Sequence, residues 1–465
     1  MVAARRPDQH HRVDGRAGGR GPGAVRSLDH VSATPQTLAR RALWLDGNYD
    51  LTGARVLCVG DHDLTSLALG LANPAVQVTV VDIDERILEL IDTEAGRLGL
   101  NVRCLFADLR FGVPPVAAGW ADMAITDPPY TPEGVQLFAT RGLQGLHGRD
   151  AGRLVVAYGF GESQPALGHK VQRAMLDLYL TFEAVDPGFN RYRGAQAVGS
   201  ASELYVCRPT PRTWRALPKL AATAAANIYT RGSQAREAVP TGTASEVFDE
   251  VVAAAAGPRE LPVGLTIGRS STLSATVSVG IDQLLTEGMP SSVARGNPHA
   301  AVADLSAGQS GWLLRVLLVT NADRLALLVP NNHPDLASEA AQRQLITLVW
   351  DKYALRFRRS SPSPRHAIVE AERIDAAGLG PTAWLARWIL DRAHGTVGSV
   401  WRDGLVRLSR DLATETLTKN QARTLVRDAA PNPDMLTGRL VDLPRHQVAG
   451  LLTSMTTAAG GLEAG

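Results

Sequence analysis

The chain has 465 residues, a length that allows two or three domains. Its 48 basic and 46 acidic residues leave a net charge of +2, which excludes a strong overall field for nucleic acid or an anionic membrane surface. The composition, 45% hydrophobic and 20% charged, is that of an ordinary globular protein. No apolar run reaches the length of a membrane span or forms the core of a secretory signal, so we expect a cytoplasmic protein.

The N-terminal segment, residues 1–26, is rich in Gly, Arg and His and lacks apolar periodicity. This composition favours a disordered basic tail, with a weak nucleic-acid or membrane arm as the alternative. The first helix is predicted over 36–44, because Pro35 stands near its first position.

Strand and helix patterns then alternate up to residue 208. The predicted strands are 55–59, 77–81, 102–106, 123–126, 153–158, 182–186 and 203–207. The predicted helices are 64–71, 85–98, 132–146 and 167–179. Short, continuously apolar strands that alternate with helices indicate an α/β doubly wound sheet. A long loop without a helix between the last two strands predicts an antiparallel hairpin, as in the seven-stranded methyltransferase-like Rossmann variant. The three cysteines, Cys58, Cys104 and Cys207, lie in such strands and are predicted to be buried thiols.

The remainder of the chain is interpreted as a linker over 209–245 and an α+β domain over 246–465. A hairpin is predicted from 312–320 and 324–329, and 344–350 fits either a strand or a helix. The other predicted elements are strands at 352–358 and 367–371 and helices at 382–393, 397–412, 419–429 and 444–456.

An acidic turn follows the first strand of the Rossmann-like domain. Gly60 stands where a backbone turns sharply or approaches a ligand, and Asp61, His62 and Asp63 come next. Two carboxylates at the mouth of a pocket favour a ligand with ammonium groups. The structural alternative is that Asp63, or Asp61, caps the following helix. His62 is able to accept a proton near neutral pH, or it is simply a surface residue.

Acidic residues also end the next two strands. Asp82 lies 22 positions after Gly60, and an acid at about this spacing binds ribose hydroxyls in dinucleotide-binding folds. Asp108 follows the third strand and could accept from the amine of adenine, or it could form an Asx-turn.

The fourth strand ends in Asp127-Pro128-Pro129-Tyr130. The prolines remove backbone donors and leave carbonyls that accept, so this turn can hold an amine with its lone pair toward an electrophile. Asp127 would hold the amine or take its proton, and Tyr130 would pack on the acceptor. Further candidates for substrate binding are Glu133, Glu162 and Tyr192, for which structural roles are equally open.

The ordered motifs G-D-H-D-L-T-S, V-V-D-I-D-E-R, F-A-D-L-R and D-P-P-Y-T resemble those of the branched-chain polyamine synthases, the N(4)-bis(aminopropyl)spermidine synthases. T-P-Q-T-L-A-R-R upstream and L-F-A-T-R-G-L downstream also match, so the resemblance covers about 27–208. It implies transfer of aminopropyl groups from decarboxylated S-adenosylmethionine to a polyamine such as spermidine. Asp61, His62 and Asp63 would then lie near the transferred group, Asp82 would hold the ribose, and Asp127 would receive the amine.

Some features depart from that family. Its turn is typically G-D-D-D, so His62 weakens the attraction for a polycation. In the place of that family's N-terminal winged-helix domain we expect only the short basic tail. Two alternatives therefore stay open: an S-adenosylmethionine-dependent amino-methyltransferase, and an inactive member that acts as a binding module. We expect no metal, membrane or nucleic-acid partner, while the oligomeric state, a homodimer included, stays open.

Overall fold

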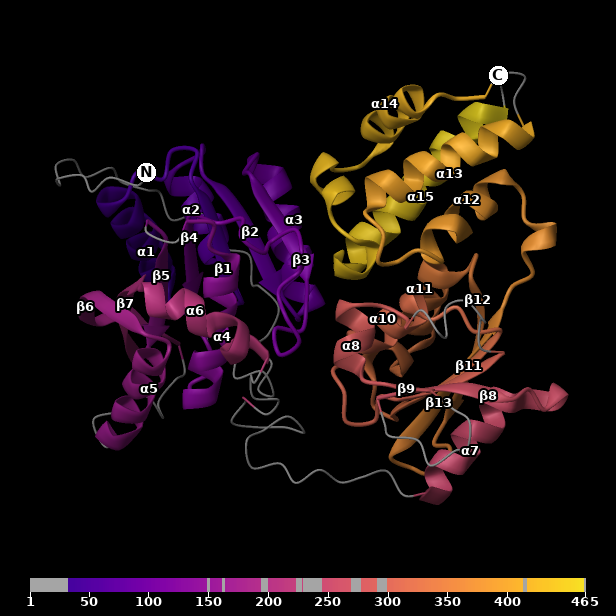
Figure 1. The fold of residues 1–465 in the computed structure, drawn as a ribbon, viewed down its shortest axis with the longest axis horizontal. Coiled ribbons are helices and arrows are strands. Elements are labelled where there is room, and N and C mark those ends of the chain that lie inside the picture. The colour runs from indigo at the N-terminus through magenta and orange to yellow at the C-terminus, as the bar shows by residue number, and fades with distance from the viewer. Residues whose placement is uncertain are drawn as a thin grey trace. The chain divides into compact units, whose positions relative to one another are not determined.

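The computed structural model describes residues 32–148, 151–160, 164–193, 200–222, 228, 245–268, 277–290, 299–412 and 416–463. The chain forms two compact units, residues 1–239 and 240–465, each with its own sheet (Figure 1). Within the described residues, no helix is long and apolar enough to cross a membrane.

The first unit is built on a seven-stranded sheet with the order β3-β2-β1-β4-β5-β7-β6. Its strands are β1 (Arg55–Val59), β2 (Gln77–Asp82), β3 (Val102–Phe106), β4 (Met123–Thr126), β5 (Arg153–Tyr158), β6 (Leu180–Arg191) and β7 (Ala201–Pro209). The first five strands are parallel to one another, whereas β7 is antiparallel to both β5 and β6. The predicted methyltransferase-like Rossmann sheet and its final antiparallel hairpin are therefore confirmed.

The helices of the first unit are α1 (Pro35–Asn48), α2 (Thr65–Ala72), α3 (Glu85–Leu98), α4 (Pro132–Gly145), α5 (Pro165–Asp177) and α6 (Pro211–Ala222). Local chemistry sets several of their ends. Thr34 and Thr131 cap α1 and α4, and each is followed by a proline at the first helical position. Helix α6 corrects the prediction of a linker over 209–245, because Trp214 and two leucines of this helix pack against the core of the first unit.

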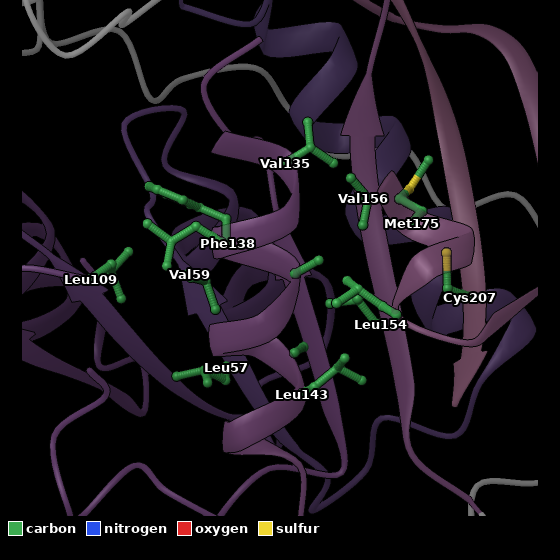
Figure 2. Close-up of a cluster of buried hydrophobic side chains, with 14 of the residues drawn as sticks. Leu57, Val59, Leu109, Val135, Phe138, Leu143, Leu154, Val156, Met175 and Cys207 are labelled. Atoms are coloured by element: carbon green, nitrogen blue, oxygen red, sulfur yellow. The ribbon is translucent and has the colours of Figure 1, made fainter. Parts of the chain in front are cut away.

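Both faces of this sheet are covered, as its apolar strands predict. Along β1, Leu57 and Val59 point into one buried cluster, while Val56 and Cys58 point into the other. Figure 2 shows the first cluster, in which Val135, Phe138 and Leu143 of α4 lie over the sheet. All three cysteines are buried and free, as predicted.

The second unit contains a six-stranded mixed sheet with the order β12-β13-β11-β10-β8-β9. Its strands are β8 (Val263–Ile267), β9 (Val277–Val279), β10 (Ala300–Asp304), β11 (Arg324–Pro330), β12 (Tyr353–Arg359) and β13 (His366–Arg373). Its helices are α7 (Ser245–Ala256), α8 (Ile281–Thr286), α10 (Trp312–Val319), α11 (Glu339–Val349), α12 (Pro381–Leu390), α13 (Val397–Leu412), α14 (Lys419–Ala429) and α15 (Arg445–Glu463). Short 3-10 helices lie at Gly257–Arg259, Pro334–Leu336, Ala376–Gly378, Pro433–Thr437 and Leu440–Asp442.

The predicted hairpin over 312–329 is wrong. Residues 312–319 form the helix α10, in which every side chain is buried, and only 324–330 form a strand. A short continuous apolar run fits a buried helix as well as a buried strand, so periodicity does not separate them. The ambiguous segment 344–350 belongs largely to the helix α11.

The two sheets share a strand order. In chain order, β8, β9, β10, β11, β12 and β13 take the places that β1, β2, β4, β5, β6 and β7 take in the first unit, and no strand among the described residues takes the place of β3. The parallel and antiparallel pairings also agree. Gly268 follows β8 with a φ of 76° and donates to Val279, just as Gly60 has a φ of 70° and donates to Val81.

Candidate active site

The glycine turn after β1 forms the centre of the site. The backbone N–H of Gly60 donates to the carbonyl of Val81 at 2.9 Å, and its φ of 70° lies in the left-handed region. A Cβ at this position would lie 3.1 Å from Cε1 of Phe138. The turn therefore requires glycine, as the sequence indicates.

Asp61 caps the helix α2. Its two carboxylate oxygens accept from the backbone N–H groups of Thr65 at 2.8 Å and Ser66 at 3.0 Å. Burial raises the pKa of Asp61 to about 7, although the hydrogen bonds from Ser66 oppose this shift. Of the two capping alternatives left open by the sequence, the structure therefore supports Asp61.

Asp63 is not the cap of α2, so that alternative is wrong. The residue at the cap position is Leu64, which has a φ of 65° and makes no side-chain cap. Asp63 instead accepts from the backbone N–H of Ala33 at 2.7 Å and forms a buried ion pair with Arg41 at 3.1 Å. The left-handed Leu64 places Asp61, four residues before Thr65, over the open end of the helix.

Asp82 lies beside this turn, at the end of β2. Its Oδ2 accepts from the N–H of Asp61 at 2.9 Å, and its Oδ1 accepts from the N–H of Asp84 at 2.8 Å. Each carboxylate oxygen can accept a second hydrogen bond, so the position remains suited to ribose hydroxyls. Burial raises the pKa of Asp82, and the two backbone hydrogen bonds oppose this.

Asp108 is held by Arg110. Its Oδ1 accepts from the backbone N–H of Arg110 at 3.1 Å and from Nε at 2.8 Å, and its Oδ2 accepts from Nη2 at 2.5 Å. The Asx-type turn that was one of the two sequence alternatives is therefore present. The contact with adenine stays a prediction.

Asp127 is held by a residue that the sequence analysis did not identify. Arg41 of α1 reaches Oδ2 of Asp127 at 2.6 Å, and the hydroxyl of Tyr192 donates to the same oxygen at 2.6 Å. The hydroxyl of Tyr130 lies 3.3 Å from Oδ1. Burial raises the pKa of Asp127, whereas the Arg41 guanidinium lowers it.

Aromatic side chains surround this carboxylate. The ring of Tyr130 makes edge contacts with Tyr158 and Tyr192, at centroid distances of 5.3 Å and 6.4 Å. Pro128, which precedes Tyr130 by two residues, is buried. An aromatic wall next to a carboxylate suits an amine, because ring faces attract cations.

The remaining predicted residues take different places. His62 is half-buried, with Nε2 3.4 Å from Oγ of Ser32. Glu133 lies in the first turn of α4, where a carboxylate interacts favourably with the helix dipole. Glu162 lies outside the described residues. Tyr192 was placed in a long loop, but it follows directly on β6, forms a bridge with Ala33 and is buried against Asp127.

The site thus consists of two groups of residues in contact. One group contains Gly60, Asp61 and Asp82, and the other contains Asp63, Asp127, Tyr130 and Tyr192. Sequence reasoning missed Arg41, Asn190 and Ser202. Asn190 accepts from Arg41 and donates to Ser202, whose hydroxyl lies 2.8 Å from that of Tyr192. A signal for Arg41 was present, because it stands four residues from both Thr37 and Leu45 on the buried face of α1. Among the described residues, no cluster of His, Cys, Asp and Glu is arranged to hold a metal ion.

Comparison with known proteins identifies relatives of the first unit. Residues 13–224 match the family described as Branched-chain polyamine synthase A C-terminal domain. An uncharacterized protein of Methanocaldococcus jannaschii is 36% identical over 183 residues, which is 38% of this chain and 44% of that protein. The N(4)-bis(aminopropyl)spermidine synthase of Thermus thermophilus is 40% identical over 129 residues, or 27% of this chain and 37% of that enzyme.

A solved structure also matches: the branched-chain polyamine synthase from Thermus thermophilus in complex with N4-aminopropylspermidine and 5'-methylthioadenosine. It is 26% identical, with a TM-score of 0.36, and the match covers 41% of this chain and 60% of that chain. The chain spans less than half the length of the curated relatives that it matches. Its first unit is therefore a relative of the C-terminal domain of the branched-chain polyamine synthases, as the ordered motifs predict.

Proposed function

We propose that the first unit transfers an aminopropyl group from decarboxylated S-adenosylmethionine to an amine of a polyamine such as spermidine. The observation that carries this proposal is the register of three neighbouring strands. Val59 of β1 pairs with Val81 of β2 and with Thr126 of β4, so Asp82 and Asp127 follow on either side of Gly60. The acid that we assign to the ribose and the acid that we assign to the amine therefore flank one turn, at the strand ends where ligands of doubly wound sheets bind.

The charge of the site supports a donor without a carboxylate. Asp61, Asp63, Asp82 and Asp127 are gathered around this turn, and the only guanidinium found among them in the described residues is that of Arg41. The carboxylate of S-adenosylmethionine would meet like charges among these largely buried side chains. Decarboxylated S-adenosylmethionine presents an ammonium group instead, and so does a polyamine.

The proposed step is an in-line displacement. The lone pair of the acceptor nitrogen attacks the propyl carbon next to the sulfonium, a C–N bond forms, and the C–S bond breaks. Methylthioadenosine leaves with the electron pair of the broken bond, which neutralises its sulfur. The acceptor nitrogen loses one proton, and in this proposal Asp127 receives it.

Turnover and binding test the proposal together. Titration calorimetry with decarboxylated S-adenosylmethionine and with S-adenosylmethionine would compare the two donors, and chromatography would detect methylthioadenosine when spermidine is added. We expect preference for the decarboxylated donor and spermidine-dependent product. Preference for S-adenosylmethionine would favour an amino-methyltransferase, and binding of neither donor would favour an inactive binding module.

Asp127→Asn is the decisive variant. We expect turnover to fall by roughly 100-fold or more, because the amide does not accept the proton of the amine. Asp122→Asn is a matched control, since Asp122 precedes the same strand at its opposite end and pairs with Arg55 at 3.2 Å. Equal activity in the two variants would refute the role of Asp127.

A further inference from the structure

Arg41 uses its whole guanidinium within the protein. Its Nε donates to Oδ1 of Asn190 at 2.7 Å, Nη1 donates to Asp63 at 3.1 Å and Thr65 at 3.2 Å, and Nη2 donates to Asp127 at 2.6 Å and Tyr192 at 3.1 Å. A guanidinium has five N–H donors and no acceptor, so these contacts occupy the full set. Every one of these partners must therefore accept from Arg41.

This requirement sets the direction of the neighbouring hydrogen bonds. Because Oδ1 of Asn190 faces Arg41, its Nδ2 faces Oγ of Ser202 and donates to it at 2.9 Å. The Ser202 hydroxyl lies 2.8 Å from the hydroxyl of Tyr192 and is left to donate to it. Tyr192 has one proton, and that proton is directed to Oδ2 of Asp127.

Arg41, Asn190, Ser202 and Tyr192 thus form a closed ring of hydrogen bonds, which we call the Arg41 ring. The ring joins α1 to the end of β6 and the start of β7, since Asn190 lies on β6 and Ser202 on β7. Arg41, Asn190, Ser202 and Tyr192 are all buried. Water therefore has little access to compete for these hydrogen bonds.

The Arg41 ring makes the two oxygens of Asp127 unequal. Oδ2 accepts from Arg41 and from Tyr192, both at 2.6 Å, whereas the hydrogen bond donated to Oδ1 within the described residues is the weaker 3.3 Å contact from Tyr130. The Asp63 carboxyl also lies against the Asp127 side chain. The Asp127 side chain is 17% exposed and that of Arg41 only 2%. The side of the carboxylate that is left to a ligand is therefore the Oδ1 side.

We propose that the Arg41 ring positions Asp127 so that Oδ1 is the atom that receives the proton of the acceptor amine. Arg41, Asn190 and Ser202 are positioning residues in this scheme, and Tyr192 is one as well, in place of the substrate contact expected from the sequence. The proposal rests on the proposed function, in which Asp127 meets an amine.

The charged and titratable groups that face Asp127 determine the effect of breaking the ring. They are Arg41 from α1, Asp63 from the turn after β1, Tyr130 from its own turn, and Tyr192 after β6. Arg41 lowers the pKa of Asp127, while burial and Asp63 raise it. Burial raises the pKa values of both tyrosines well above their ordinary value, so they remain neutral donors.

The test is to follow the carboxyl carbon of Asp127 by NMR during a pH titration of the full chain, in the wild type and in Arg41→Gln. Removing an adjacent opposite charge should raise the pKa of Asp127 by about 1–3 units. The acid limb of the pH profile of kcat/KM should move by the same amount. Affinity for methylthioadenosine should stay within a few-fold, which separates positioning from loss of the site.

Ser202→Ala provides a milder variant in case Arg41→Gln does not fold. It keeps Arg41 and removes the hydroxyl that donates to Tyr192 and accepts from Asn190, so a smaller rise of the same pKa is expected. Arg55→Gln is the matched control, because Arg55 also pairs with an aspartate but at the other end of the sheet. An Asp127 titration unchanged in Ser202→Ala and in every folded Arg41 variant would overturn the proposal.

The NMR titration needs no turnover, so the two proposals fail separately. A wild type without transfer to any amine would refute the proposed function while the carbon signal still reports on the ring. If the wild type is active but Asp127 titrates in the variants as it does in the wild type, only the positioning role of the Arg41 ring is refuted.

Discussion

Replacing Gly60 by alanine tests the geometry of the turn at the centre of the site. The φ of 70° lies in the left-handed region, where an L-residue with a Cβ is less stable by about 1–2 kcal/mol. The new methyl would also lie 3.1 Å from Cε1 of Phe138 and 4.0 Å from Oδ2 of Asp82. We expect Gly60→Ala to lower the free energy of unfolding of the first unit by this conformational cost and by a further amount, because the Phe138 ring must shift.

Gly53→Ala separates the two contributions. Gly53 has nearly the same φ, 71°, but a Cβ there would have nothing within 4 Å. This variant should therefore lose only the conformational term and keep its affinity for methylthioadenosine. Urea unfolding, followed through the NMR methyl signals of Leu57 and Val59, measures the stability of the first unit, and calorimetry measures binding.

The result that would refute this reasoning is a Gly60→Ala protein that matches Gly53→Ala in both measurements. Equal stability would mean that Phe138 does not constrain the turn. Unchanged affinity would mean that a ligand does not approach the backbone at this position.

Two further predictions concern stability. Burial lowers the pKa of Lys352 to about 7, against about 10.4 in an unfolded chain, so unfolding takes up a proton between these values and the stability of the second unit should rise with pH there. This rise in the free energy of unfolding is up to about 1.4 kcal/mol per pH unit, and urea unfolding at pH 7 and pH 9 would measure it. Lys352→Met should flatten the rise. A pH dependence that is unchanged in this variant would mean that another group causes it. In the first unit, Gly145→Ala would press a methyl against Leu57 and should destabilise the fold by about 1–3 kcal/mol. Gly96→Ala lies on an exposed part of α3 with nothing within 4 Å of its Cβ, so it should stabilise the fold by up to about 1 kcal/mol. Equal effects of the two variants in thermal unfolding would contradict this packing argument.

The sequence predicts the first sheet well because each strand is a short apolar run that ends in a polar turn. Asp82 and Asp127 could be placed at one edge of the sheet for the same reason, since the carboxyl ends of parallel strands meet there. Such an argument uses only local patterns and a general rule of topology. It needs no knowledge of which side chains touch.

The Arg41 ring could not be found in this way. Its members, at 41, 190, 192 and 202, come from α1, β6, the residue after β6, and β7, and they meet only when the sheet is complete. The misplaced helix cap has another cause. Asp61 and Asp63 are both plausible caps in the sequence, and the left-handed Leu64 between them and the helix decides which one reaches it.

The second sheet carries its own counterpart of the candidate site. Ile267 pairs with Val279 and with Ala303, so Gly268, Gly280 and Asp304 follow where Gly60, Asp82 and Asp127 follow in the first sheet. The turn glycine is present in both units, and so is the acid at the end of the neighbouring strand, β4 or β10, but the position of Asp82 holds Gly280 in the second unit. Strand order and a glycine turn are requirements of the backbone, whereas recognition depends on individual side chains. A comparison based on topology alone would assign both halves of this chain to one functional class. One of these three positions, however, already holds a residue of different chemistry in the second half.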